Sequence, residues 1–506
     1  MENKYHNSLS WDSLSRLIII GFAVLQVVRW RILPQFMDIY YHLSTAWGFI
    51  QAGGWSGWDF WQYAPVGRVH IYPPLFHIIL ALFMKMGVDT VILAKLFECI
   101  IPVLFLVVIW YFTRKNYRES MAFFAVIACA GSLSFYLNLI NHIPATLAMI
   151  FGILSLDQLF QKRSLRAGIL LALAFYTHIG ISWFFILAVI LYGLFDREHK
   201  RTVSGVVVYA LLLSLPVIIK QLAGLGAVSR LGLNLNEKNL CRFKMVEYIL
   251  AVPGFILALK SAGKYRLFPA LFLASLVFLV YPYRFFSAEG YLPVVFLSAC
   301  GLESFYNKCL GGIPRLRYGV FFLAAFIFFA SPAIIMDRPA GAGSRTYRFS
   351  LFESAFPGMA LPKYDENVLA GSIWFPEEYL SASRFIKENS RKDDIVYSSI
   401  NLLGVAFSGI TGRATANALL PEIDASEKFD PLSVSKILVI ARDEAPEQVR
   451  DIETGYRLVR IGQSKLFTFY DNPECSAKVK VRPAAIPFWL IGIAFGVFMY
   501  LFLRAK

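Results

Sequence analysis

Long apolar runs separated by short polar segments are the most regular feature of this sequence. The runs recur from residue 17 to residue 336, and one more extends from residue 485 to residue 503. A hydrocarbon core about 30 Å thick needs roughly 20 apolar residues per spanning helix. By that criterion the pattern predicts a mainly α-helical, polytopic membrane protein with about twelve transmembrane helices.

Composition agrees with this interpretation. Of 506 residues, 57% are hydrophobic and 16% aromatic, and the mean hydropathy is +0.56. The net charge of +15 is carried by Lys and Arg in short loops between apolar runs, where such residues set membrane orientation. We therefore expect no nucleic-acid partner. The six cysteines lack CxxC spacing and resemble small core residues rather than a zinc site or a disulfide framework.

Basic clusters predict the orientation, because short loops rich in Lys and Arg stay cytoplasmic. Placing all of these clusters on the cytoplasmic side puts both termini in the cytoplasm. We expect the membrane to be the plasma membrane. The apolar stretch 74–86 then becomes a short external interfacial or re-entrant helix. The run 167–195 is too long for one ordinary helix, so a turn at Thr177 and His178 divides it into two short spans. The clusters lie at residues 114–118, 162–166, 197–201, 260–266, 308–317 and 504–506.

A change in composition after residue 336 predicts three regions. Residues 1–336 would form the transmembrane module, with a first external loop at 34–88. Residues 337–482 would form an extracytoplasmic α/β domain, since 377–389 has helical spacing and three β-rich runs follow. Those runs are 395–400, 436–441 and 465–470. Residues 483–506 would form the final transmembrane helix.

The first external loop carries the candidate chemistry. Ile39, Leu43, Trp47 and Ile50 recur at helical spacing, which predicts an amphipathic helix at the membrane surface. Asp38 begins this helix, where a carboxylate can act as a general base, bind a metal or simply cap the helix. The nearby aromatic residues are typical of an interface belt, although aromatic rings also stack on sugars. They include Trp55, Trp58, Trp61, Tyr63 and Tyr72.

Two further sets of charges are candidates. Lys95 and Glu98 are three residues apart within one apolar run, so we expect them to pair on one helix face. Cations at the outer interface could hold a lipid-linked phosphate, and the orientation places several there. They are Arg29, Arg31, Arg68, Arg230 and Arg284. An interfacial arginine can equally be one that extends its charged end to water.

Several motifs resemble the GT-C superfamily of membrane glycosyltransferases, which includes the catalytic subunit of oligosaccharyltransferase and the protein mannosyltransferases. The first loop reads Asp-x-Tyr-Tyr-His-Leu from Asp38 and then His-x-Tyr-Pro-Pro-Leu-x-His from His70. Weaker similarities are the Ala-Phe-Tyr-Thr-His turn ending at His178 and the Tyr-Arg-Phe-Phe segment around Arg284. The Ser-Gly-Ile-Thr-Gly-Arg segment at 408–413 is similar to C-terminal domains of that group.

The resemblance implies sugar transfer from a polyprenyl-phosphate or polyprenyl-diphosphate donor, with inversion of the anomeric centre. Asp38 would deprotonate or orient the acceptor, which could be a lipid, a glycan or a protein. Arg284 resembles the arginine that binds the donor phosphate, and Glu289 could pair with it or join the acceptor site. Four histidines could hydrogen-bond or protonate a leaving phosphate, or serve only as interfacial polar residues. They are His70, His77, His142 and His178. His42, one turn after Asp38, is a further candidate for binding substrate.

Two departures from the oligosaccharyltransferase pattern limit what is implied. The segment 138–144 reads Asn-Leu-Ile-Asn-His-Ile-Pro where those enzymes carry a second acidic pair. The metal therefore stays unassigned, with Mg²⁺ or Mn²⁺ retained as a hypothesis and Asp38, His142 and His178 as its conceivable ligands. Their Trp-Trp-Asp-Tyr-Gly motif is also absent, so transfer to asparagine sequons is not expected. A transporter, a lipid-carrier flippase and an inactive sugar-lipid binder remain alternatives.

Overall fold

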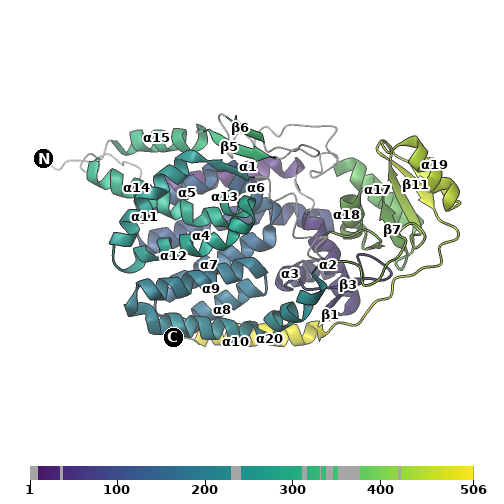
Figure 1. Cartoon of the computed structure of the whole chain (residues 1–506), viewed down its shortest axis with the longest axis horizontal. Coiled ribbons are helices and arrows are strands. Elements are labelled where there is room, and N and C mark those ends of the chain that lie inside the picture. Colours follow the sequence, from purple (N-terminus) through teal and green to yellow (C-terminus); the bar gives the residue numbers. More distant parts are fainter. Residues whose placement is uncertain are drawn as a thin grey trace.

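The computed structural model describes residues 10–32, 34, 38–228, 241–309, 316–330, 332–337, 346–350, 376–419 and 423–504. Long helices running side by side make up one part of the molecule, and a smaller sheet-containing part lies at one end of them (Figure 1). Six helical segments are long and apolar enough to cross a membrane: Trp11–Val28, Thr90–Asn116, Ile143–Phe160, Arg197–Ala227, Gly263–Val280 and Pro282–Lys308. The protein is therefore an integral membrane protein built mainly of helices.

The predicted count of about twelve spans is not reached by this criterion. A pair of helices bent by 79°, Glu119–Gly131 with Ser134–Asn141, raises the six spans to at most seven within the described residues. The other apolar helices are shorter, and they include α3 (Leu75–Lys85), α8 (Ser164–Phe175), α9 (Ile179–Phe195) and α20 (Phe488–Arg504). Hydropathy merges or lengthens such segments because it does not show where a helix bends.

The predicted break within residues 167–195 is present. Helix α8 ends at Phe175 and α9 begins at Ile179, and the imidazole Nδ1 of His178 accepts the Ile181 N–H at 3.4 Å. The other helices of the transmembrane part are α1 (Trp11–Val28), α4 (Thr90–Asn116), α5 (Glu119–Gly131), α6 (Leu133–Asn141), α7 (Ile143–Phe160), α10 (Lys200–Gly224), α11 (Met245–Lys260), α12 (Leu267–Ser275), α13 (Pro282–Phe286), α14 (Leu292–Cys309) and α15 (Leu316–Ala330). Short 3₁₀ turns occur at η1 (Arg29–Ile32), η2 (Arg197–His199), η3 (Leu225–Ala227), η6 (Gly263–Arg266), η7 (Leu276–Val280) and η8 (Glu289–Tyr291).

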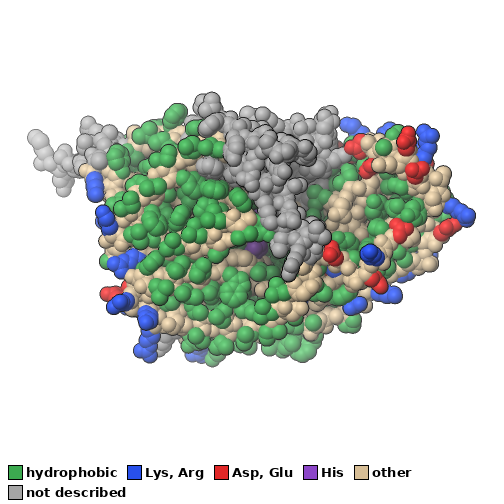
Figure 2. All heavy atoms as spheres, viewed as in Figure 1, with side chains coloured by type: hydrophobic (Ala, Val, Ile, Leu, Met, Phe, Trp, Pro, Cys, Tyr) green, Lys and Arg blue, Asp and Glu red, His purple; other side chains and the backbone are tan. Residues whose placement is uncertain are grey.

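Basic segments predicted to share one side of the membrane gather at one end of the helices. Lys115 Nζ lies 2.9 Å from an Asp157 carboxylate oxygen, and Lys264 donates to the Asn116 side chain at 3.0 Å. Arg166 donates to the Phe502 carbonyl, which places the end of α20 there as well. Lys and Arg side chains lie along this end, on the left of Figure 2, while hydrophobic side chains cover the helices.

The first external loop folds into a compact unit rather than a surface layer. It contains α2 (Asp38–Ala52), β1 (Gly54–Trp55), β2 (Trp58–Asp59), β3 (Arg68–Val69) and α3. The predicted helix is present as α2, but nearly all of it is buried, including Tyr40, Tyr41 and Thr45 on the side expected to face water. Trp55 and Trp61 are also buried within protein, so the belt interpretation is wrong for these two. Gly48 makes room for the Trp61 ring, which would overlap any Cβ at that position.

The smaller part is built on a mixed five-stranded sheet of order β10-β11-β9-β7-β8. Strands β8 and β9 run parallel to β7, whereas β11 is antiparallel to both β9 and β10. Helices α17 and α18 cover one face, and α19 packs on the other. The elements are α17 (Pro376–Asn389), β7 (Ile395–Ser398), α18 (Asn401–Thr411), β8 (Ala414–Thr415), β9 (Ile437–Ala441), α19 (Pro446–Gly455), β10 (Val459–Gln463) and β11 (Phe467–Asp471).

Two smaller sheets tie distant segments together. Strand β12 (Ile486–Pro487) pairs with β1, so the chain entering α20 is held against the first loop. Strand β5 (Ala333–Asp337) lies between β4 (Cys241–Lys244) and β6 (Thr346–Ser350) in an antiparallel sheet.

Candidate functional site

Asp38 is the first residue of α2, at the edge of the buried loop unit. Its side chain is 32% exposed, and one carboxylate oxygen lies 3.3 Å from Nδ1 of His142. A partly exposed carboxylate with a defined imidazole partner can exchange a proton with a bound substrate. The structure thus pairs two of the predicted site residues that are 104 positions apart in the chain.

His142 is the single residue between α6 and α7. Pro144 is the second residue of α7 and has no N–H to donate, which suits a position where a helix begins. Burial lowers the pKa of His142, but the hydrogen bond and charge of Asp38 more than offset it, so the pKa lies above its ordinary value.

Arg284 and Glu289 form a second pair close by. Nη1 of Arg284 lies 3.0 Å from Oε1 of Glu289, whose side chain is fully buried. The other oxygen of Glu289, Oε2, has no hydrogen-bond partner among the residues that the structure describes, although buried carboxylate oxygens are normally satisfied. Both residues act electrostatically on the pKa of His142, so the two pairs border one site.

Tyr72 joins these pairs, and the sequence interpretation gave it no site role. Burial, followed by the charges of Tyr41 and Asp38, raises its pKa, and the charges of Arg284 and Glu289 also reach it. Its ring centroid lies 6.2 Å from that of His178 and 5.5 Å from that of His42. Its place between His70 and the Pro-Pro pair of the first-loop motif was the signal that could have identified it.

His42 and His77 form a buried pair behind Asp38. Nδ1 of His42 and Nε2 of His77 are 2.9 Å apart, so one ring must donate and the other accept. Burial lowers the pKa of His42 to about 3 and that of His77 well below its ordinary value. Burial thus favours the neutral form of both rings, which suits a packing role better than protonation of a leaving phosphate by His77. The rings of both histidines pack against the Tyr72 ring and so help to position it.

His70 and His178 occupy different positions. His70 is buried against Phe49 and Trp61, and burial keeps its pKa well below the ordinary value. No distance or charge contact joins it to Asp38 among the described residues. His178 lies at the start of α9, and burial together with Arg284 and His142 lowers its pKa well below the ordinary value. It belongs to the site as a neutral side chain.

An apolar groove leads away from Arg284 and His178. Its volume is about 680 Å³, and it runs between α9 and the segment η7 that precedes α13. Apart from His178, Arg284 and Tyr281 at one end, its lining is hydrophobic and includes Trp183, Ile190 and Val277. This shape suits a ligand with a charged head and a long hydrocarbon tail.

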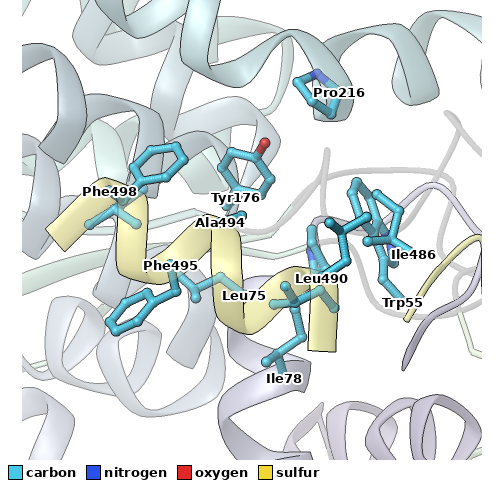
Figure 3. Close-up of a pocket in the computed structure, with 13 residues that line it drawn as sticks. Trp55, Leu75, Ile78, Tyr176, Pro216, Ile486, Leu490, Ala494, Phe495 and Phe498 are labelled. Carbon is cyan, nitrogen blue, oxygen red and sulfur yellow. The ribbon is translucent and has the colours of Figure 1, made fainter. Parts of the chain in front are cut away.

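A second apolar pocket, of about 230 Å³, lies between α20 and the first loop (Figure 3). Trp55, Leu75 and Phe498 line it. Tyr176 also lines it, but its hydroxyl donates a hydrogen bond to the Leu213 carbonyl. None of the predicted site residues borders this pocket.

Arg68, one of the cations proposed for an outer phosphate, has a structural role instead. It is buried and donates to Asp59 at 3.1 Å, to the Gln62 side chain at 3.0 Å and to the backbone carbonyls of Ile423 and Leu419. It therefore fastens the first loop to the C-terminal part. Arg29 donates to Tyr136, and the other two cations, Arg31 and Arg230, lie where no side chain is described.

Helix α18 packs directly on α2 and thereby supports Asp38. The hydroxyls of Ser44 and Ser408 are 2.7 Å apart, and Trp47 donates to the Gly409 carbonyl at 3.2 Å. A Cβ on Gly409 would lie 2.4 Å from the Tyr40 carbonyl oxygen, so only glycine allows this approach. The 408–413 motif thus functions as a docking surface for the helix that begins at Asp38.

The donor set does not suit Mg²⁺ or Mn²⁺. These cations prefer about six ligands, mostly oxygen, and usually several carboxylates. Asp38 offers one carboxylate and His142 one nitrogen, and no cluster of three His, Cys, Asp or Glu side chains occurs among the described residues. The predicted convergence of Asp38, His142 and His178 as ligands is therefore not met, and no step below depends on a metal.

Comparison with known proteins places these features in a family context. Residues 72–223, from Tyr72 through most of α10, match the family described as dolichyl-phosphate-mannose-protein mannosyltransferase. Comparison with curated protein sequences gives no match.

Solved structures of two enzymes share the fold. The apo oligosaccharyltransferase of Archaeoglobus fulgidus has a TM-score of 0.56 and 12% identity, over 93% of this chain and 75% of that one. The same organism's oligosaccharyltransferase AglB, in complex with an inhibitory peptide and a dolichol-phosphate, has a TM-score of 0.55 and 11% identity, over 84% and 69%. ArnT from Cupriavidus metallidurans has a TM-score of 0.52 and 11% identity, over 90% and 98%. The predicted resemblance to GT-C membrane glycosyltransferases is thus confirmed for the fold.

Proposed function

We propose that this protein transfers a sugar from a polyprenyl-phosphate donor to an acceptor on the extracytoplasmic side of the membrane. The observation that carries the proposal is the contact between Asp38 and His142 beside the polar end of the apolar groove. A flippase would need the groove but not an acid–base pair at its head. The acceptor could be a lipid, a glycan or a protein.

Each side chain then has a chemical task. Asp38, held in place by its contact with His142, takes the proton of the acceptor hydroxyl as that oxygen attacks the anomeric carbon. The bond from this carbon to the phosphate oxygen breaks, and the polyprenyl phosphate leaves with the electron pair. Attack opposite the leaving group inverts the anomeric centre. Arg284 stabilises the negative charge on the departing phosphate, and the free oxygen of Glu289 accepts a sugar or acceptor hydroxyl.

The similar solved structures support this choice of donor. The solved structure of the oligosaccharyltransferase AglB is a complex with a dolichol-phosphate, a lipid with the charged head and long tail that the groove here would suit. The same fold also occurs in complex with Zn and sulfate. The donor set around Asp38 gives no comparable cluster, so we propose transfer through Asp38 without a resident metal.

We expect the outer domain and the termini on opposite sides of the plasma membrane. If α8, α9, α11, α15 and α20 also cross, the number of spans reaches about twelve. Residues 337–482 then lie outside, and both termini lie in the cytoplasm. Single cysteines placed at exposed Lys428 and at exposed Arg201 of a cysteine-free variant test this in intact cells. An impermeant thiol reagent should label position 428 only, and labelling of position 201 from outside would refute the orientation.

Removing the cation at the head of the groove should weaken donor binding. We expect Arg284→Gln, combined with Glu289→Gln so that no buried carboxylate is left unpaired, to raise the KM for donor about 10- to 100-fold. Arg284→Lys should fall between this variant and the wild type, because Lys keeps the charge but loses the planar fork. Initial rates over a donor titration measure the effect.

The exposed Arg201→Gln is the matched control, since it removes a cation at the opposite end of the helices. An unchanged donor KM in the Arg284 variants at an unchanged melting temperature would show that the phosphate binds elsewhere.

A further inference from the structure

A pocket of about 380 Å³ lies between the start of α4 and helix α17. It shares no lining residue with the groove at Arg284. Helices α17 and α18 stand between the sheet and the transmembrane helices (Figure 1), so the pocket lies where the C-terminal part meets the membrane part.

Three cations border this pocket. Arg384 and Lys387 are three apart on α17, and Lys95 comes from the second turn of α4. The predicted Lys95–Glu98 pair does not form: within the described residues Lys95 makes no ion pair, and its ammonium lies 6.0 Å from the Trp30 ring centroid. Arg384 and Lys387 also lack an acidic partner among the residues described.

The remaining polar groups leave this charge unbalanced. Among the described residues Asp89 is the only acidic one in the lining, and its carboxylate already accepts the N–H groups of Val91 and Ile92 at 2.9 and 3.1 Å. Ser383 lines the pocket as well. It is buried, and its hydroxyl has no hydrogen-bond partner within the part of the chain that the structure describes. Arg384 and Lys387 are exposed, and Lys95 is partly buried. Like charges brought together around a cavity with an unused hydroxyl favour binding of an anion, and a phosphate group can accept from all of them.

Exposed apolar side chains extend from the pocket along α1 and α4. Val27 and Val28 end α1 immediately before Trp30, while Ile92 and Ile100 lie on the outer surface of α4. In a membrane this surface contacts acyl chains. A phosphate in the pocket would therefore be attached to a lipid whose chains lie on α1 and α4.

We propose that this pocket binds the phosphate head group of an anionic membrane lipid. Because Lys95 belongs to the membrane part and Arg384 and Lys387 to the C-terminal part, one phosphate bridges the two and holds α17 over α4. Helix α18, which supports Asp38, packs beside α17. The inference is independent of glycosyl transfer, since lipid binding is measured directly.

The test compares the purified full-length protein with Arg384→Gln/Lys387→Gln by native mass spectrometry and thermal unfolding. Phosphatidylglycerol, phosphatidylcholine and inorganic phosphate are added separately. At about fivefold per cation, the double variant should bind phosphatidylglycerol about 25-fold more weakly than the wild type. The wild-type melting temperature should rise with phosphatidylglycerol only.

The control is Lys392→Gln/Lys428→Gln, which removes two exposed lysines of the same part of the chain that do not line the pocket. It should bind phosphatidylglycerol as the wild type does. Equal affinity of both double variants would overturn the site. Equal stabilisation by phosphatidylcholine or by inorganic phosphate would overturn its assignment to an anionic lipid.

Discussion

Asp38→Asn should reduce sugar transfer by about 10²- to 10⁴-fold, the contribution expected of a positioned general base. Asparagine keeps the size and the polarity of the side chain but cannot accept the acceptor's proton. Donor affinity should change little, because Arg284 and the apolar groove remain intact. Single-turnover rates and donor-binding isotherms, measured on the same preparation, separate the two effects.

A comparison at His142 strengthens this experiment. His142→Gln retains a donor toward Asp38, whereas His142→Ala leaves the carboxylate without its partner at 3.3 Å. We expect the alanine variant to lose more activity than the glutamine variant. Transfer by Asp38→Asn at a rate near that of the wild type would exclude Asp38 as the base.

Arg68→Met should cause the largest loss of stability. The substitution leaves Asp59 buried without its cation and removes hydrogen bonds to Gln62, Ile423 and Leu419. Breaking a buried ion pair costs about 3–5 kcal/mol. Thermal unfolding in detergent should show the loss, with proteolysis first attacking residues beyond 376. The exposed Arg457–Glu474 pair supplies the control, and Arg457→Met should leave the melting temperature close to that of the wild type.

The pH dependence of this destabilisation has a definite sign. Burial raises the pKa of Asp59 to about 6 even with Arg68 beside it, and the pKa must rise further without Arg68. A carboxyl group whose pKa is higher in the folded state stabilises the fold at low pH and loses that contribution as the pH rises through the folded pKa. Arg68→Met should therefore be less destabilised at pH 5 than at pH 8. The same loss at both values would show that Asp59 does not carry the effect.

Much of the transmembrane part could be predicted because hydrophobic runs and basic loops are local properties of the chain. Local patterns also predicted the break before α9. They predicted helix α17 and strands β7, β9 and β11 as well. Which of the shorter apolar helices bend or end within the membrane could not be predicted, since a bend such as the 79° one between α5 and α6 leaves no trace in mean hydropathy.

The candidate site was predicted in part. Asp38, His142 and Arg284 could be singled out because polar residues at the ends of apolar runs are conspicuous. Their pairing depends on tertiary packing over more than a hundred residues, which spacing cannot reveal. The burial of α2 was missed because α18, which packs on α2 at Ser44 and Trp47, comes from the far end of the chain. An ion pair between Lys95 and Glu98 was predicted because helical spacing takes no account of side chains from other segments, such as Trp30.

The most direct test of the proposed function is turnover by the wild-type protein in lipid nanodiscs. A polyprenyl-phosphate sugar, labelled in both the sugar and the lipid, is supplied with a membrane extract as the source of acceptors. The account predicts release of free polyprenyl phosphate in equal amount with a glycosylated product whose anomeric configuration is inverted. Donor that binds in the groove, or crosses the bilayer in liposomes, without cleavage of its sugar–phosphate bond would contradict it and favour a flippase or an inactive binder.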